Sequence, residues 1–314
     1  MPAVLLSSLD SVLAGVSPGI DAPPGMLGRT LATARAWYDQ GRNAVVLRHL
    51  PDLLRLADQE LESGHPDAME RYCQVNDLAT DLLDKVGLVG AARLTAQNSI
   101  RVSRQSGSPL AMAAADRGLT IVLRHEGKTA TANLVSLRAA NLIERTGLTD
   151  VRQAISYVQV MCTHAYVAAQ NEDRSTVLAA IGEAARAASC LRDRVPPEIA
   201  DRATANARMY RVSVHWALGD AGTAVEAGRQ VDVRALPTPE RRARHFTDMA
   251  RAWWAWRKPD ETACSLLTAL HFAPAEVTDR ARIRAIVEQL TRHHTAVNSA
   301  RHLAAKVAAL PASS

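Results

Sequence analysis

The sequence predicts an all-α protein, an α-solenoid of about six to seven helical hairpins that repeat with a period of ~43 residues. The first observation concerns the residues that mark helix starts and stops. A proline or a Thr-Asp pair repeatedly precedes a segment long enough to form a helix. A glycine, an asparagine or an Arg-Lys pair follows it. Proline suits the first helical turn, where its missing N–H has no partner, and glycine or asparagine suits the left-handed residue after the last turn. The starts are Pro66, Pro109, Thr149-Asp150, Pro196 and Pro239, and the stops are Gly87, Gly127, Asn171, Gly219 and Arg257-Lys258.

The second observation is the spacing of these starts. The first two prolines are 43 residues apart, as are the last two, and 87 residues separate Pro109 from Pro196. Because 87 is about twice 43, Thr149-Asp150 supplies the missing start in the middle. A second helix-length segment fits between each stop and the next start. Each unit is therefore a helix–turn–helix that buries its apolar face only against its neighbours.

Composition is the third observation. Apolar residues make up 47% of the 314, whereas aromatic residues make up only 4%. Alanine is abundant, has the best helix propensity and lets helices approach closely. The composition therefore favours closely packed helices around a continuous core.

Several features bear on the compartment. No run approaches the ~18 consecutive apolar residues of a membrane-spanning helix. Residues 1–16 contain Asp10 and no Lys or Arg, which is not typical of a signal peptide. The scattered cysteines form no CxxC pair, which indicates a reduced protein, so we expect a cytoplasmic location without membrane association. The cysteines are Cys73, Cys162, Cys190 and Cys264.

Three segments are expected along the chain. Residues 1–28 form an N-terminal linker with a weak helix, because prolines and glycines gather between residues 18 and 25. Residues 29–294 form the repeat array, and residues 295–314 form a tail helix. Pro51 lies inside the second expected helix and either kinks or restarts it. The expected helices are 29–41, 43–62, 66–86, 90–106, 109–126, 128–146, 151–170, 173–192, 197–218, 220–231, 239–257, 259–272, 275–294 and 296–309.

Some stretches resemble a known family. They are Asn206 to Asp220, Ala235 to Trp253 and Ala273 to Val277, with Ala34 to Tyr38, Leu50 to Leu54 and Glu183 to Ala188 fitting the same pattern. They resemble the C-terminal tetratricopeptide-repeat region of actinobacterial (Streptomyces-type) helix-turn-helix transcriptional regulators. The resemblance covers residues 29 to about 290 and implies a tetratricopeptide-like solenoid with a regulatory or sensor function. Most matching positions are packing and turn residues, so they specify the fold better than the ligand.

The chain also departs from that family. The family carries a DNA-binding domain before the repeats, whereas only residues 1–28 stand there in this sequence. Tyr210 occupies a position where the family leads us to expect histidine. The net charge is +5 and the pI is about 9.3, but the arginines are spread over many helices with acidic neighbours. We expect no specific DNA binding by this chain alone.

Polar residues recur at helical spacing on three of the expected first helices. The first helix of each pair lines the concave face of such solenoids, and residues at i, i+4 and i+7 share one helix face. An asparagine amide both donates and accepts hydrogen bonds, and an arginine holds a carboxylate in a fork, so these types suit a peptide or small-molecule ligand. The alternative is that they only cap the polar side of amphipathic helices. The candidate ligand-binding residues are Tyr157, His164, Asn206, Tyr210, Arg241, His245 and Trp37, with Ser213 and Asp248 on the same faces.

Two further clusters are weighed against simpler explanations. Asp77, Asp81 and Asp84 share one helix face, but no second acidic motif accompanies them, so we interpret them as a solvated face. No metal site and no cofactor are predicted. Indoles can stack on a flat ligand, but adjacent tryptophans point in different directions on a helix, so at least one belongs to the core. The clustered tryptophans are Trp216, Trp253, Trp254 and Trp256.

Sequence signatures of common enzymes are missing: there is no GxGxxG, P-loop, GxSxG or HExxH motif. The predicted function is a tetratricopeptide-like regulatory or sensor protein that binds a peptide or small molecule in its concave groove. One alternative is a stand-alone enzyme of specialised metabolism whose pocket is recruited from the groove, with unknown catalytic residues. A third hypothesis is a scaffold for a protein partner or for a second copy of the chain.

Overall fold

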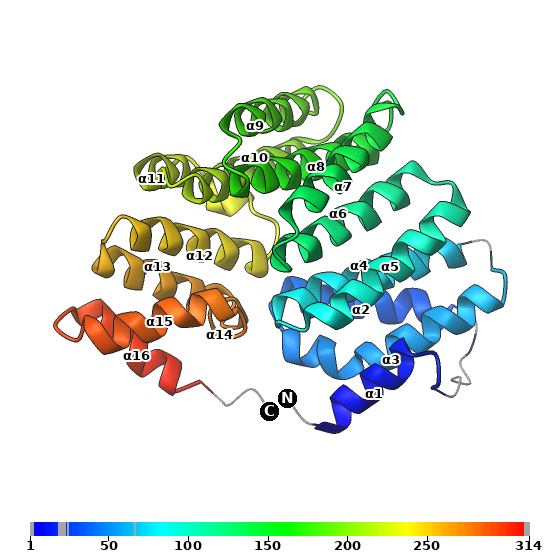
Figure 1. The fold of residues 1–314 in the computed structure, drawn as a ribbon, viewed down its shortest axis with the longest axis horizontal. Helices are drawn as coiled ribbons and strands as arrows, with labels where there is room; N and C mark the ends of the chain where they lie inside the picture. Colours follow the sequence, from blue (N-terminus) through cyan, green and yellow to red (C-terminus); the bar gives the residue numbers. More distant parts are fainter. Residues whose placement is uncertain (1–2, 18–22, 24, 66, 311–314) are drawn as a thin grey trace. The chain divides into compact units, whose positions relative to one another are not determined.

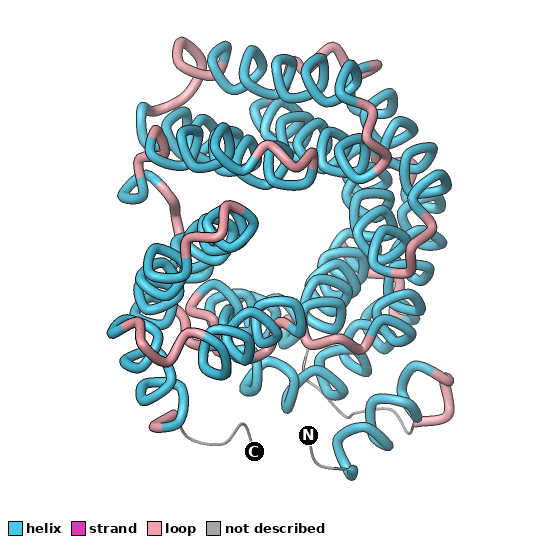
Figure 2. Tube along the Cα trace, turned by 60° about the vertical axis from the view of Figure 1, so that its left-hand side comes forward, coloured by secondary structure: helices cyan, strands magenta, loops and turns pink. Residues whose placement is uncertain are grey.

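The computed structural model describes residues 3–17, 23, 25–65 and 67–310 of the 314-residue chain. Helix accounts for 81% of these residues and none of them lies in a β-strand, which confirms the all-α class (Figure 2). The chain divides into two compact units. The first unit ends at Leu142, and the second spans Ile143–Leu310.

The first unit is a stack of helical hairpins (Figure 1, blue to cyan-green). The first helices α2, α4 and α6 pack side by side and form one layer, and α3 and α5 each pack on the first helix of the next hairpin. α7 is tied to α6 by two hydrogen bonds of 2.7 and 2.6 Å from Arg138 to Asp116. The helices are α1 (Ala3–Leu13), α2 (Met26–Asp39), α3 (Asn43–Glu62), α4 (Ala68–Lys85), α5 (Val89–Ser106), α6 (Pro109–His125) and α7 (Thr129–Glu144), whose last two residues belong to the second unit.

The second unit is itself built from helical hairpins. Its first helices α8, α10 and α12 pack in order, each against its own second helix, α9, α11 or α13, and α15 and α16 form a closing hairpin on α13. The helices are α8 (Val151–Gln170), α9 (Arg174–Cys190), α10 (Pro197–Ala217), α11 (Ala221–Arg229), a 3-10 turn η1 (Val233–Ala235), α12 (Pro239–Ala255), α13 (Pro259–Phe272), α14 (Ala275–Thr278), α15 (Ala281–His293) and α16 (Asn298–Ala308).

The predicted repeat period is confirmed. Successive hairpins begin every 41 to 46 residues, against an expectation of ~43. Hairpins that each pack only on their neighbours constitute an α-solenoid. The first helices of the seven hairpins begin at Met26, Ala68, Pro109, Val151, Pro197, Pro239 and Ala281.

The predicted helix starts have a local cause at each N-terminus. The Thr238 side chain accepts a hydrogen bond from the Arg241 N–H, and Pro239 occupies the first turn of α12. α8 begins with a reciprocal capping box between Asp150 and Gln153. The predicted start at Pro66 lies outside the described residues.

The helix ends that were predicted at glycines are confirmed. Gly87, Gly127 and Gly219 have φ angles of 88°, 75° and 81°, a left-handed backbone that glycine adopts without steric cost. The expected stop at Asn171 is wrong by one residue. Asn171 has a φ of −91°, and Glu172 takes the left-handed conformation instead, with a φ of 59°.

Two expectations about helix continuity are settled by the structure. α3 runs without interruption through Pro51, which is buried on its inner face, so the proline does not restart the helix. In contrast, the single helix expected over 275–294 is wrong, because Asp279 and Arg280 separate α14 from α15. The break lets the Arg280 guanidinium reach Thr247 of α12 at 3.0 Å, a long-range contact that no local pattern encodes.

The two ends of the array are more integrated than expected. Within residues 1–28, α1 packs on α3 and buries Leu9 and Val12, so the weak helix belongs to the core of the first unit. α2 begins at Met26, three residues before the expected boundary. The expected linker residues 18–22 and 24 lie outside the described part. Within 295–314, α16 is the second helix of the last hairpin and buries Leu303.

Small residues allow the helices of the second unit to approach closely. Gly228 of α11 lies against Met249 of α12, and a Cβ placed on Gly228 would stand 2.0 Å from the Met249 sulfur. Met249 is buried, so it has little room to withdraw. The absence of a side chain at residue 228 therefore sets the distance between α11 and α12.

We expect Gly228→Ala to lower the free energy of unfolding by about 1–3 kcal/mol, because the added methyl forces Met249 to repack. Gly182→Ala is the matched control. Gly182 lies in the middle of α9, and a Cβ there meets only the flexible end of Arg186 at 3.6 Å. This control should raise stability by up to about 1 kcal/mol through helix propensity. Urea unfolding of both variants tests the packing; equal stabilisation by both would contradict it.

Candidate functional site

The predicted residues of α8 are buried within their own hairpin. Tyr157 is 4% exposed, and burial, followed by the charge of Glu183, raises its pKa to about 12. His164, two turns later, is also buried, which lowers its pKa, while Asp173 acts in the opposite direction. Glu183 belongs to α9 and Asp173 is the N-cap of α9. Acidic residues of the second helix of the hairpin therefore act electrostatically on both predicted side chains.

Three of the predicted residues on α10 and α12 are closer to the surface. Asn206 and Tyr210 are half-buried and one turn apart on α10. Arg241, near the start of α12, keeps 36% of its side chain exposed and pairs with Glu240 at 3.6 Å. Arg241 also acts electrostatically on Cys162 of α8, although burial is the main cause that raises the pKa of that thiol to about 12.

His245 and Trp37 occupy different environments. His245 is 3% exposed on α12, and its Nδ1 makes no hydrogen bond to the described residues. Trp37 lies in the first unit, where it stacks on His49 with ring centroids 5.2 Å apart. All the other predicted ligand-binding residues lie in the second unit.

The most prominent polar feature of the second unit is a buried ionic network centred on Asp248 of α12. Its carboxylate accepts a hydrogen bond of 2.8 Å from the Ser213 hydroxyl of α10. It also accepts bonds from the guanidinium groups of Arg244 at 3.2 Å and Arg251 at 3.3 Å. The Arg251 guanidinium in turn lies over the Trp216 ring at 5.1 Å.

The network extends to the helix break between α14 and α15. Arg280 donates to the Thr247 hydroxyl at 3.0 Å and to the buried Glu276 carboxylate at 3.2 Å. We call these side chains the Asp248 network: Ser213, Arg244, Thr247, Asp248, Arg251, Glu276 and Arg280. It joins α10, α12 and α14 through side chains that are mostly inaccessible to water.

Electrostatics keeps the members of this network charged. Burial alone would raise the pKa of Asp248, but Arg244 and Arg251 lower it to about 2. Burial and the charges of Arg244 and Arg251 lower the pKa of Arg280 to about 10. A carboxylate held this firmly in its ionised form is a poor general base at neutral pH. The network therefore suits the orientation of charged groups better than proton transfer.

Sequence reasoning found part of this network and missed the rest. Ser213 and Asp248 were expected on the ligand-facing sides of their helices. The three network arginines were missed because arginines are common along the chain and most were interpreted as surface residues. The useful signal is the i−4 and i+3 placement of Arg244 and Arg251 around Asp248 on one helix.

The acidic ladder of α4 is not the solvated face that the sequence favoured. Asp77 accepts a hydrogen bond of 2.8 Å from Ser99 of α5. Asp81 pairs with Arg117 of α6 at 3.4 Å, and Asp84 pairs with His125 of the same helix at 2.5 Å. Each carboxylate therefore serves a contact between neighbouring helices. No group of three metal-ligating side chains is found in the described part of the chain.

The tryptophans divide between core and surface. Trp253 and Trp256 stack with ring centroids 5.6 Å apart, and Trp256 is 47% exposed. Trp254 packs edge-on against His294 at 5.8 Å, on the side of the closing hairpin. Adjacent indoles thus point in different directions, as the helical spacing predicts.

Comparison with protein-family models finds no matching family, and comparison with curated proteins finds no matching protein. No helix in the described ranges combines the length and apolar character that a membrane crossing requires. The function must therefore be inferred from the side chains and their geometry.

We expect Asp248→Asn to lower the free energy of unfolding by about 3–5 kcal/mol, because it leaves buried guanidinium groups without their counter-charge. Glu183→Gln is the matched control, since Glu183 pairs with Arg186 on an exposed helix face. That control should change stability by less than about 1 kcal/mol. Chemical denaturation measures both, and a mild effect of Asp248→Asn would show that water reaches the network.

His245 gives a second prediction, in pH dependence. Burial lowers its pKa from 6.5 to about 4. Between these values the unfolded chain binds a proton that the folded chain does not, so stability falls as the pH falls from 6.5 to 4. The loss attributable to this residue is up to about 3 kcal/mol. His245→Phe should flatten thermal stability over that window, whereas His302→Phe, at an exposed position, should not. Parallel profiles for wild type and His245→Phe would contradict the assignment.

Proposed function

We propose that this chain is the ligand-binding part of a regulatory system. It is a cytoplasmic, tetratricopeptide-like sensor that binds a peptide or small molecule on the first-helix layer of its second unit. The proposal is supported by an all-α hairpin array and by the electrostatic proximity of side chains from α8, α10 and α12. The resemblance of the sequence to the repeat region of helix-turn-helix regulators suggests the regulatory role.

Arg244 is the observation that carries the proposal. Its Nε donates to Asp248, yet 26% of the side chain is accessible to solvent. The carboxylates of Asp248 and Glu276 outweigh burial and raise its pKa above the ordinary value, so it is always charged. An arginine has five N–H donors in a rigid fork, and the contact with Asp248 employs only one nitrogen. Such a pre-oriented guanidinium loses little freedom when it binds a carboxylate.

The neighbours of Arg244 define the expected ligand chemistry. Tyr210 of α10 acts electrostatically on Arg244. Asn206 lies one turn before Tyr210 on the same helix. Arg241 adds a second, half-exposed guanidinium one turn before Arg244 on α12. A ligand with a carboxylate for the arginines and an amide for Asn206 fits this surface, which describes a short peptide or an acylated amino acid.

A scaffold role is the second candidate, and one observation favours it. Leu134 and Leu137 of α7 are 69% and 45% exposed and lie about one turn apart. Exposed leucines at this spacing suit a partner helix or a second copy of the chain. The ligand experiment below separates the two roles.

We expect a screen of short peptides and N-acyl amino acids to yield a compound that stabilises the chain. At a hundredfold excess over its dissociation constant, the gain in stability is about 2.7 kcal/mol. Asn206→Ala and Arg241→Gln should each abolish this thermal shift while leaving the melting temperature of the free protein nearly unchanged, because both residues are partly exposed.

Arg202→Ala is the control for this experiment. Arg202 is exposed on α10, the helix that carries Asn206, so the thermal shift should survive its replacement. If Asn206→Ala lowers the stability of the free protein by several kcal/mol, Asn206 is a structural hydrogen-bonder instead. If no compound shifts the melting temperature while the chain self-associates through α7, the scaffold role is favoured.

A further inference from the structure

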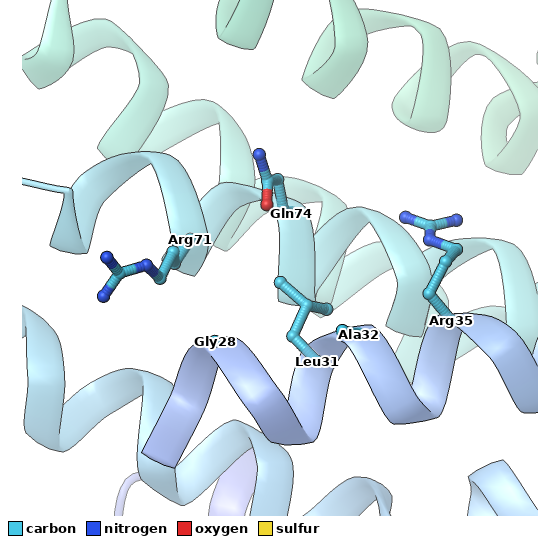
Figure 3. Close-up of a pocket in the computed structure, with 6 residues that line it drawn as sticks. All are labelled: Gly28, Leu31, Ala32, Arg35, Arg71 and Gln74. Carbon is cyan, nitrogen blue, oxygen red and sulfur yellow. The ribbon is translucent and has the colours of Figure 1, made fainter. Parts of the chain in front are cut away.

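The first unit contains a pocket between its first helices α2 and α4. Its volume is about 470 Å³, within the range of small-molecule sites. Figure 3 shows Arg71 and Arg35 at opposite ends of the pocket, with Leu31 and Gln74 between them. The lining residues are Gly28, Leu31, Ala32 and Arg35 of α2, and Arg71 and Gln74 of α4.

The pocket exists because α2 carries small residues on this face. Gly28 has no side chain, and a Cβ there would already stand 3.9 Å from the Arg71 Nε. Ala32 follows one turn later, so only Leu31 projects a larger apolar side chain between the two ends. The floor is therefore apolar and the two ends are basic.

The two arginines of the pocket are in different states. Arg71 is held by ion pairs to Glu60 and, at 2.7 Å, to Asp67. Arg35 forms no ion pair with any residue in the described ranges. The acid that acts on it is Asp77, whose carboxylate already accepts the Ser99 hydroxyl. Burial raises the pKa of Asp77 to about 7, with Asp81 adding to this and Ser99, Arg117 and Arg35 opposing it. Burial thus weakens the negative charge that Asp77 presents to Arg35.

We propose that this pocket binds a small amphipathic carboxylate, with its head group on Arg35 and its apolar body over Gly28, Leu31 and Ala32. A guanidinium that makes no ion pair and lies at the end of an apolar hollow can hold a carboxylate through two parallel N–H···O bonds. The apolar floor favours binding of the hydrocarbon part of the ligand, since burial of each CH₂ group contributes about 0.8 kcal/mol to the binding free energy. Neither contribution depends on the second unit.

The test is isothermal titration calorimetry of the full chain with octanoate at pH 7.0, and with 1-octanol as the uncharged probe of equal chain length. Octanoate should bind one site, and 1-octanol should bind at least tenfold more weakly. Arg35→Gln should weaken octanoate at least tenfold and remove its advantage over 1-octanol. Gly28→Leu and Ala32→Leu, which fill the pocket from two positions, should abolish binding of both probes.

Arg29→Gln is the matched control, because Arg29 is exposed on the same helix and the substitution removes the same charge. It should leave the octanoate affinity unchanged. Thermal melting of each variant shows that it is folded. The proposal is overturned if octanoate does not bind, if 1-octanol binds equally well, or if octanoate binding survives in folded Arg35→Gln and Ala32→Leu.

Discussion

Each hairpin of this chain can bury its apolar face only against its neighbours, and this constraint governs the rest of the structure. It favours small contact residues, because helices that share several neighbours must approach all of them closely. Ala243 and Ala250 of α12 and Ala263 and Ala269 of α13 are fully buried for this reason. The close approach of Gly228 to Met249 is the extreme case.

Close packing leaves little room for large apolar side chains, and charged side chains occupy part of the interior. The Asp248 network shows the consequence: one carboxylate accepts hydrogen bonds from two arginines and a serine across two helices. Such a cluster adds little net stability compared with an apolar replacement, but a shifted helix would leave buried charges unpaired. We interpret the network as the device that fixes the register of α10, α12 and α14.

The fold could be predicted from the sequence because its signals are local. Proline, aspartate and glycine mark helix ends through their own backbone and side-chain chemistry, as Asp150 and Gly219 show. The break at Arg280 could not be predicted in this way, because its cause is a contact with Thr247, 33 residues earlier. The same limit applies to the sites: helical spacing placed Asn206 and Tyr210 on one face of a helix but could not reveal that Glu183 of α9 acts on Tyr157 of α8. The pocket at Gly28 was missed because its signal is the absence of a side chain.

Arginine has two roles in this protein, and they differ in whether a carboxylate of the chain pairs with the guanidinium. Arg251 and Arg280 are buried beside Asp248 and Glu276, which satisfy their charge, so their donors are committed to the fold. Arg35 lies at the end of an apolar hollow and makes no ion pair with the described residues. Residue type alone cannot distinguish these cases in a basic, arginine-rich chain. The distinction requires the charge balance around each guanidinium, and an arginine whose counter-charge the protein itself does not supply is where an anionic ligand gains most by binding.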